Sequence, residues 1–128
     1  MDELKKIDDF TFEVLEKLLL KNLPEYRAII ELENKEDHHS FGVYLFLNDF
    51  SSFLCNEISR DPESDFVNRA FSYINEVGES NNLEVLNILR VGILEILYTS
   101  DNVNRDFVSS SLSEKLRKYF LDFSRYYN

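Results

Sequence analysis

An all-α fold, a compact single-domain bundle of about six or seven helices, is predicted by three features of this sequence of 128 residues. Only 3 Gly and 2 Pro interrupt the chain, and no Asn-Gly or Asp-Gly turn separates two alternating apolar segments, which disfavours a β-rich fold. Apolar residues recur at spacings of three and four over several stretches. Hydrophobic residues make up 44% of the chain, with 11 Phe and 7 Tyr, enough to fill one core. We therefore expect one domain over residues 1–128.

Helical spacing begins close to the N-terminus. Apolar residues from Phe10 to about Lys21 recur every three or four positions, which predicts a helix. Pro24 then predicts the start of a short helix around Tyr26 to Leu32, because proline fits the first helical turn, where its missing N–H costs nothing. The polar stretch from Glu33 to Ser40 follows, and we expect it to form an exposed loop.

The aromatic stretch from Phe41 to Ser59 could be predicted either as a strand or as a helix. Its apolar run from Val43 to Leu47 would locally suit a strand. The apolar pattern nevertheless continues to Leu54 without a glycine or a proline, and that length exceeds the usual strand. Length therefore favours a helix here.

The clearest helical signal runs from about Asp61 to Glu79. Asp61 is expected to cap the free amides at its start, and Pro62 fits the first turn. Gly78 lies close to the expected end. The apolar residues recur at spacings of three and four and are Phe66, Val67, Ala70, Phe71, Ile74 and Val77. This pattern predicts a helix with one buried face.

A second strong helix is expected from about Leu83 to Tyr98. Asn81 is its expected N-cap, and Glu84 three residues later gives a variant of the capping box. Apolar residues lie on more than one side of this segment and are Val85, Leu86, Ile88, Leu89, Val91, Ile93, Leu94, Ile96 and Leu97. Because so little polar surface remains, we expect this helix at the centre of the bundle.

The sequence pattern of the C-terminal region predicts one more helix, which follows Ser111. Ser111 and Glu114 match the Ser-x-x-Glu capping box that marks a helix start. The buried stripe expected after this box consists of Leu112, Leu116, Tyr119, Phe120 and Phe123. A short helix between Asn102 and Val108 also suits the pattern and would precede it.

The charge of the chain restricts its partners. It has 24 Asp and Glu against 14 Lys and Arg, a net charge of -10, which disfavours binding to nucleic acid or an anionic membrane and favours a basic protein partner. No apolar run approaches the roughly 20 residues that span a bilayer, and the charged N-terminus does not resemble a secretory signal. The single cysteine, Cys55, cannot form a disulfide within the chain. We therefore expect a soluble, cytoplasmic protein.

Candidate catalytic and metal-binding residues are few. Glu36 and His39 have the Glu-x-x-His spacing of dimetal bundles, but such sites need two copies and one is present, which favours a solvated turn. Cys55 lies among apolar and acidic residues that oppose thiolate formation, which favours a buried core residue. The glycine motifs of phosphate-binding loops and nucleophile elbows are absent. We expect no catalytic residue, no metal and no cofactor, with hydrolysis by a pair of acids as a minority hypothesis.

Acidic charge is concentrated in the middle of the chain. From Asp49 to Asp106 there are 11 acidic residues and four arginines, and no lysine occurs between Lys35 and Lys115. This field suits either a solvated surface or the binding of a basic partner, and both remain open. The residues expected to meet a partner are Asp61, Glu63, Asp65, Tyr73, Glu76, Glu79 and Glu84. Tyr73 would be an aromatic anchor if it is exposed, and an ordinary core residue if it is buried.

Two consecutive segments carry a resemblance to a known kind of protein. The turn Asn81-Asn82-Leu83-Glu84-Val85-Leu86-Asn87 is followed by Val91-Gly92-Ile93-Leu94-Glu95-Ile96-Leu97. Together with the two helices before them, residues 41–100 resemble the small acidic helical immunity proteins of bacterial toxin–immunity systems of the contact-dependent growth inhibition type. The same helix-pair pattern occurs in HEAT-type repeats, but no second copy of a repeat is found, which favours a compact bundle.

The resemblance implies a protein that binds and neutralises a cognate toxin, a basic nuclease, by covering its active site with an acidic surface. It carries over no individual binding residue. The alternative is a non-catalytic helical adaptor that holds two host proteins together. A gene placed downstream of a reading frame with a basic C-terminal domain would favour immunity, whereas an adaptor needs no such neighbour.

Overall fold

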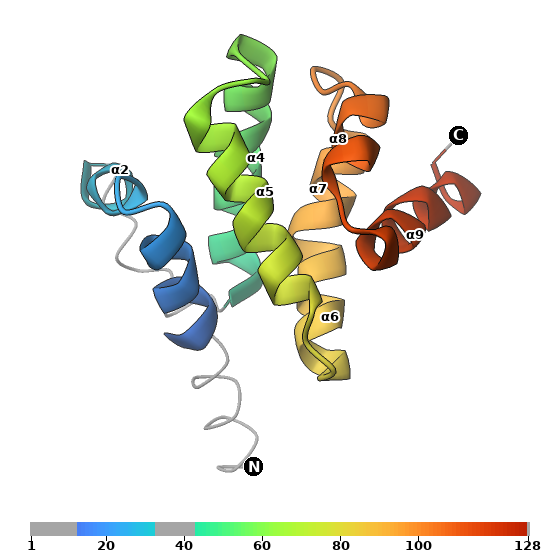
Figure 1. The fold of residues 1–128 in the computed structure, drawn as a ribbon, viewed down its shortest axis with the longest axis horizontal. Helices are drawn as coiled ribbons and strands as arrows, with labels where there is room; N and C mark the ends of the chain where they lie inside the picture. The colour runs from blue at the N-terminus through green and yellow to red at the C-terminus, as the bar shows by residue number, and fades with distance from the viewer. Residues whose placement is uncertain (1–12, 33–42, 128) are drawn as a thin grey trace.

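The computed structural model describes residues 13–32 and 43–127 (Figure 1). These residues form helices and connecting turns, without a strand among them, which confirms the all-α prediction. The helices are a first helix at 13–22, α2 (Tyr26–Leu32), α4 (Val43–Arg60), α5 (Asp65–Gly78), α6 (Leu83–Leu89), the π-helical η2 (Arg90–Leu94), α7 (Glu95–Thr99), α8 (Arg105–Ser111), α9 (Glu114–Asp122) and the 3-10 helix η3 (Phe123–Arg125). None of them is both long and apolar enough to cross a membrane.

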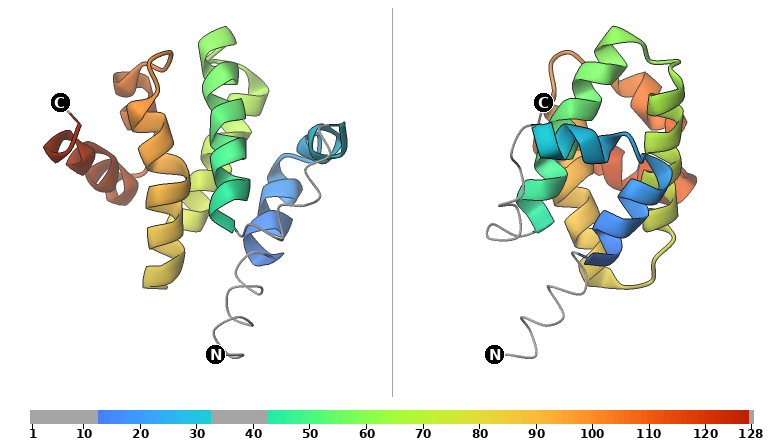
Figure 2. Two further views of the ribbon diagram at one scale, coloured as in Figure 1. Left: turned by 180° about the vertical axis from the view of Figure 1, so that it is seen from behind. Right: turned by 90° about the vertical axis from the view of Figure 1, so that its left-hand side faces the viewer.

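Three rods make the centre of the bundle. Helices α6, η2 and α7 join end to end, and this rod runs parallel to α4, as the view from behind shows (Figure 2). Two hydrogen bonds agree with this parallel direction. Near the start of both rods, Asn87 donates to the Tyr44 hydroxyl at 3.3 Å. Further along both rods, the Ser51 hydroxyl donates to the Gly92 carbonyl at 2.9 Å. Helix α5 runs antiparallel to both α4 and the rod α6–η2–α7, and it connects them along the chain. Two parallel helices joined by an antiparallel one are the local arrangement of HEAT-type helix pairs.

Most predicted helices are confirmed, with small shifts at their ends. The first helix occupies 13–22 within the expected region, and α2 has the expected bounds. The stretch that competed between strand and helix is the helix α4, with eight of its residues buried. The expected loop from Glu33 to Ser40 and the pair Glu36 and His39 lie outside the described residues.

The predicted cap of α5 is wrong. Asp61 does not begin this helix; its carboxylate accepts a hydrogen bond from the Glu63 amide at 3.1 Å and closes a turn that contains Pro62. The cap is Ser64, whose hydroxyl accepts from the Val67 amide at 3.2 Å. Aspartate side chains readily bond the backbone two residues ahead, so the turn takes up the residues that the sequence pattern assigned to the first helical turn.

Two further caps lie one or two residues later than predicted. Asn82, not Asn81, caps α6 and accepts from the Glu84 amide at 2.9 Å. Ser113, not Ser111, caps α9, and Ser111 is instead the last residue of α8. In both places neighbouring residues have the same capping chemistry. The direction in which the chain enters the helix decides between them, and packing sets that direction.

The rod from Leu83 to Thr99 contains a π-helical segment that the sequence did not predict. The Glu95 amide donates to the carbonyl of Arg90, five residues earlier, so one residue is inserted into the helical ladder. A side chain at Gly92 would crowd α4, because a Cβ there would lie 3.1 Å from the Leu47 Cβ. The two parallel rods are therefore in close contact at this segment.

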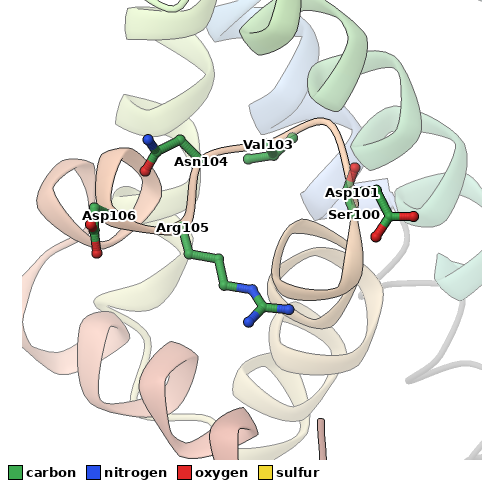
Figure 3. Close-up of a pocket in the computed structure, with 6 residues that line it drawn as sticks. All are labelled: Ser100, Asp101, Val103, Asn104, Arg105 and Asp106. Atoms are coloured by element: carbon green, nitrogen blue, oxygen red, sulfur yellow. The ribbon is translucent and has the colours of Figure 1, made fainter. Parts of the chain in front are cut away.

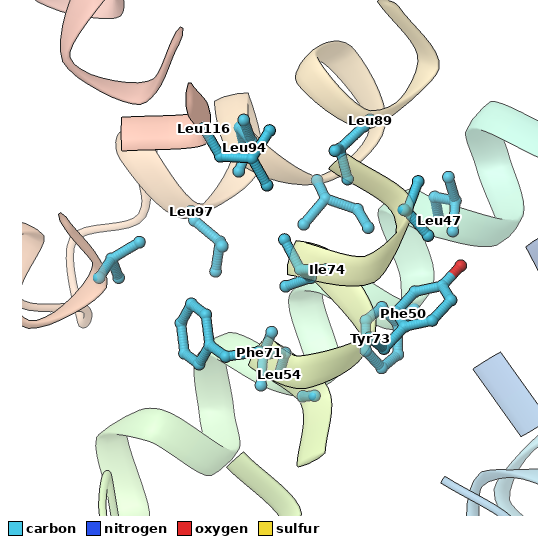
Figure 4. Close-up of a cluster of buried hydrophobic side chains, with 14 of the residues drawn as sticks. Leu47, Phe50, Leu54, Phe71, Tyr73, Ile74, Leu89, Leu94, Leu97 and Leu116 are labelled. Atoms are coloured by element: carbon cyan, nitrogen blue, oxygen red, sulfur yellow. The ribbon is translucent and has the colours of Figure 1, made fainter. Parts of the chain in front are cut away.

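The hydrophobic core lies between these three rods, and the first helix, α2, α8 and α9 also contribute buried residues to it. Figure 4 shows a part of this core. The residues at its centre are fully or almost fully buried and include Leu47, Phe50, Leu54, Phe71, Tyr73, Ile74, Leu89, Leu94, Leu97 and Leu116. The expectation that the rod after Leu83 is central is confirmed, since it contacts α4, α5, α8 and α9. Val91, one of the apolar residues of the predicted pattern, is 41% exposed, so the pattern overstates burial at that position.

Candidate functional site

The six carboxylates expected to meet a partner all lie on the surface, at the two ends of α5. One group, Asp61, Glu63 and Asp65, lies before and at the start of this helix, and the other, Glu76, Glu79 and Glu84, lies at its end and in the first turn of α6. A helix of 14 residues is about 20 Å long. The structure therefore divides the predicted site into two groups.

Tyr73 is wrong as a surface anchor, because its side chain is completely buried. Its ring packs edge-on against Phe50 with the centroids 6.0 Å apart, and its hydroxyl donates to the Leu15 carbonyl at 3.1 Å. Burial raises the pKa of the hydroxyl above its ordinary value. The position was readable from the sequence, since Tyr73 lies on the same helical face as Ala70 and Val77.

The first group of carboxylates continues into the α7–α8 loop, residues 100–104. The α4–α5 turn and this loop lie at the same end of the bundle (Figure 1, Figure 2), and the Asn102 side chain donates to that of Asn56 at 3.5 Å between them. We define the acidic end by four exposed carboxylates, Asp61, Glu63, Asp101 and Asp106. Sequence reasoning missed Asp101 and Asp106, because only the tertiary contact between the loop and α4 brings them to this end.

The arginines nearest the acidic end are engaged within the chain. Arg60 forms an ion pair with Glu57, and this hydrogen-bonded carboxylate raises the pKa of Arg60 above its ordinary value. The Arg105 guanidinium lies 4.0 Å from the centroid of the Tyr98 ring, and its Nε donates to the Tyr98 carbonyl at 2.8 Å. Both guanidiniums keep their positive charge, and Asp61 also raises the pKa of Arg60, so these two arginines offset part of the negative charge at this end.

Asp65 has a structural partner instead. Arg69 donates to Asp65 at 2.8 Å, to the two Glu25 oxygens at 2.8 and 2.5 Å, and to the Asn22 carbonyl at 3.0 Å. The hydrogen bonds from Arg69 lower the pKa of Glu25 to about 2. This network joins the first helix and the turn before α2 to α5, and Asp65 therefore contributes to holding the fold together.

The second group of carboxylates lies close to a lysine. Lys115 on α9 donates from its Nζ to the Ser80 carbonyl at 3.0 Å, between Glu79 and Glu84 along the chain. Glu76 accepts a long hydrogen bond from Asn22 at 3.4 Å. A positive charge this close weakens the negative potential. The acidic end is the candidate surface for a cationic partner because its carboxylates come from separate parts of the chain, the α4–α5 turn and the segment from Asp101 to Asp106.

Two openings flank residues 100–104 and share Ser100. The first, about 330 Å³, is lined by Ser100, Asp101, Val103, Asn104, Arg105 and Asp106 (Figure 3). The second, about 320 Å³, is lined by Ser52, Cys55, Asn56, Ile96, Thr99, Ser100 and Asn102. Figure 3 shows Asp101 and Asp106 on opposite sides of Arg105.

The cysteine and the metal-ligating side chains were also candidates for chemistry. Cys55 is buried, as predicted, and desolvation raises the pKa of its thiol above the ordinary value, which opposes the thiolate. Across residues 13–32 and 43–127, no three His, Cys, Asp or Glu side chains are gathered as metal ligands would be.

Comparison with known proteins gives one match. No curated protein and no solved structure is similar to this chain at a significant level. One family model matches residues 16–128, which cover almost the whole described bundle. The chain belongs to that family, whose description is Domain of unknown function (DUF7674).

Proposed function

We propose that this protein is an immunity protein that binds a cognate basic toxin, a nuclease, through its acidic end and thereby covers the toxin's active site. The observation that carries the proposal is that the α4–α5 turn, which contains Asp61 and Glu63, and the segment from Asp101 to Asp106 lie at the same end of the bundle (Figure 1). The carboxylates come from the α4–α5 turn, the α7–α8 loop and the first turn of α8, so they are not a single run of acids in the sequence. The protein would act in the cytoplasm, where the toxin's substrate lies.

The physical basis is competition for positive charge. A nuclease holds the phosphates of its substrate with lysine and arginine side chains, and these contacts supply much of its affinity. Exposed carboxylates on a rigid helical support would meet the same side chains and exclude the nucleic acid. The net charge of -10 would also speed the encounter with a basic partner, as long-range fields of opposite sign do. Such an inhibitor needs no catalytic group of its own.

The test uses the product of the neighbouring gene with a basic C-terminal domain, purified and titrated with this protein at low and high salt. The first variant reverses three carboxylates of the acidic end, Asp61→Lys, Glu63→Lys and Asp101→Lys. We expect at least about a thirtyfold loss of affinity, because unpaired charges of like sign would face each other. The wild-type affinity should fall steeply with salt.

The matched control reverses three carboxylates at the other end of α5 and in the first turn of α6, Glu76→Lys, Glu79→Lys and Glu84→Lys. These residues are also exposed, so this control changes net charge without touching the acidic end. We expect at most about a threefold loss from the control. Equal losses from both variants would refute the acidic end as the binding surface. Recovery of host proteins alone, with no binding to the basic neighbour, would favour the adaptor alternative.

A further inference from the structure

The arginine at the start of η2 has a charge that its own fold does not pair. Arg90 is half-buried, and its guanidinium carbon lies 5.1 Å from the centroid of the Tyr119 ring on α9, the helix beside the rod (Figure 1). A guanidinium over an aromatic face is attracted by the electrons of the ring. Arg90 forms no hydrogen bond or ion pair with residues 13–32 or 43–127. The ring therefore positions this charge without neutralising it.

The two other half-buried arginines of the described segments both have oxygen acceptors. Arg69 donates to two carboxylates, and Arg117 donates to two backbone carbonyls at 2.8 and 3.0 Å. Charged side chains that lose much of their contact with water are usually paired. Arg90 is the exception among these three, in a chain with 24 acidic residues. An internal ion pair therefore does not explain why this position has an arginine.

Donors of Arg90 and Tyr119 reach the surface between η2 and α9. The Nε of Arg90 is buried and cannot meet a ligand, but its two terminal nitrogens are not buried and have no acceptor in the described part of the chain. The side chain of Tyr119 is half-buried, and its hydroxyl is likewise not buried and bonds none of the described residues. This hydroxyl belongs to the ring on which the guanidinium stacks, so both groups can reach one ligand.

The elements around Arg90 have more positive than negative charge, unlike the chain as a whole. Helices η2, α7, α9 and η3 contain five basic and three acidic side chains. The basic ones are Arg90, Lys115, Arg117, Lys118 and Arg125, and the acidic ones are Glu95, Glu114 and Asp122. Asp122 forms an ion pair with Arg125 at 3.0 Å, and Glu95 accepts a hydrogen bond from the Tyr127 hydroxyl. These carboxylates keep their charge, so the local positive excess is small.

A carboxylate matches this arrangement better than a phosphate. The two terminal nitrogens of an arginine form a planar fork that fits the two oxygens of a carboxylate. Glu95 and Asp122 would repel a doubly charged phosphate more strongly than a singly charged carboxylate, because the Coulomb energy scales with the charge. Arginine and tyrosine are also among the side chains enriched at the energetic centres of protein interfaces. The ligand expected here is therefore an acidic side chain of another protein.

We propose that Arg90 and Tyr119 bind the carboxylate of an Asp or Glu side chain of a partner protein. The terminal nitrogens of Arg90 donate to both carboxylate oxygens, and the Tyr119 hydroxyl donates to one of them. The site has no residue in common with the acidic end, so its failure would leave the proposed function untouched, and the reverse also holds.

The experiment is an NMR titration of the intact, isotopically labelled protein at constant ionic strength. The probe is N-acetyl-glutamate amide, and the matched neutral probe is N-acetyl-glutamine amide, which has an amide in place of the side-chain carboxylate. We expect the side-chain resonances of Arg90 and the ring resonances of Tyr119 to shift saturably with the acidic probe, with a dissociation constant on the order of 10–100 mM for one charge-assisted pair. The neutral probe should cause no saturable shift, and inorganic phosphate should bind more weakly than the acidic probe.

Three variants separate this site from the rest of the surface. Arg90→Gln should weaken binding of the acidic probe at least about tenfold, followed at the Tyr119 ring. Tyr119→Phe keeps the ring and removes one donor, so we expect about a threefold loss of affinity. The matched control is Arg27→Gln on α2, where the arginine is exposed, and its affinity should stay within about twofold of wild type.

The titration of the wild-type protein does not depend on how any variant folds. The inference is overturned if the acidic probe gives no saturable shift at Arg90 and Tyr119, if the two probes shift these resonances equally, or if Arg27→Gln weakens binding as much as Arg90→Gln. Tighter binding of phosphate than of the acidic probe would overturn the assignment of a carboxylate ligand.

Discussion

The hydroxyl of Ser51 lies 2.9 Å from the carbonyl oxygen of Gly92, at the contact between α4 and the π-helical segment. It also lies 2.7 Å from the Leu47 carbonyl on its own helix, and it can donate its one hydrogen to either. An inserted residue disturbs the regular backbone pairing of a helix. A serine from α4 supplies a donor there, inside a core where Ser51 is completely buried.

Ser51→Ala should lower the free energy of unfolding by about 1–3 kcal/mol, because a buried carbonyl would lose its partner. Urea denaturation followed by circular dichroism measures this change. Ser52→Ala is the matched control, since Ser52 is the next residue on α4 and is exposed. We expect the control to stay within about 0.5 kcal/mol of wild type. Equal midpoints for the two variants would contradict the structural role of Ser51.

Gly78→Ala should destabilise the fold by about 1–3 kcal/mol through overpacking. A Cβ at this position would lie 2.5 Å from Leu116 Cδ1 and 2.7 Å from its Cγ, and Leu116 is completely buried, so it has little room to move. The control is a double-mutant cycle with Leu116→Ala. In that background Gly78→Ala should be neutral or stabilising, because the clash is gone and alanine favours the helix. Strictly additive effects would show that the two residues do not meet.

Glu25→Gln should reduce stability at neutral pH and have no effect in strong acid. The pKa of Glu25 is lowered to about 2 in the folded protein, below the usual value near 4.3. Its stabilisation is therefore complete above about pH 5 and is lost as the pH falls toward 2. Because the carboxylate is 46% exposed, the gain at neutral pH should be about 1 kcal/mol or less.

Denaturation of wild type and Glu25→Gln across this pH range measures the effect, with Glu79→Gln, at an exposed position, as the control. The difference between wild type and Glu25→Gln should shrink steadily with falling pH. A difference that stays constant from neutral pH to pH 2 would mean that the ion pair with Arg69 does not contribute.

Tyr73→Phe should destabilise the protein by about 1 kcal/mol at neutral pH, because the Leu15 carbonyl loses a donor at 3.1 Å in the core. The pKa of Tyr73 is raised by burial, so the folded state holds this proton more tightly than the unfolded state, whose tyrosines titrate near 10. Stability from the protonated hydroxyl is therefore complete below about pH 10 and falls above it.

Denaturation as the pH is raised tests this part of the prediction. Wild type should lose stability above about pH 10 more steeply than Tyr73→Phe, since the variant lacks the buried phenol at position 73. Tyr126→Phe is the control, because Tyr126 is 71% exposed, and it should follow wild type. Parallel curves for wild type and Tyr73→Phe would contradict the buried, protonated tyrosine.

Helix positions were predictable because periodicity is a local property. The spacing of apolar residues from Phe66 to Val77 depends only on the turn of the helix, and it correctly predicted α5 and its buried face. Caps were less predictable, since Asn81 and Asn82 have the same chemistry and only the path of the chain selects Asn82. The same limit applied to the site, where the exposed carboxylates were predicted but their division between the two ends of α5 was not.

The sequence by itself determined that this protein is helical, acidic and built around one core, because composition, charge and periodicity are sums over local residues. Only the tertiary structure decided which polar groups meet. It brought Asp101 to the end where Asp61 lies, buried Tyr73 against Phe50, and inserted the π-helical turn that lets Ser51 reach Gly92. These relationships join residues that are distant in the chain, and close packing of whole helices, not any local pattern, sets their distances.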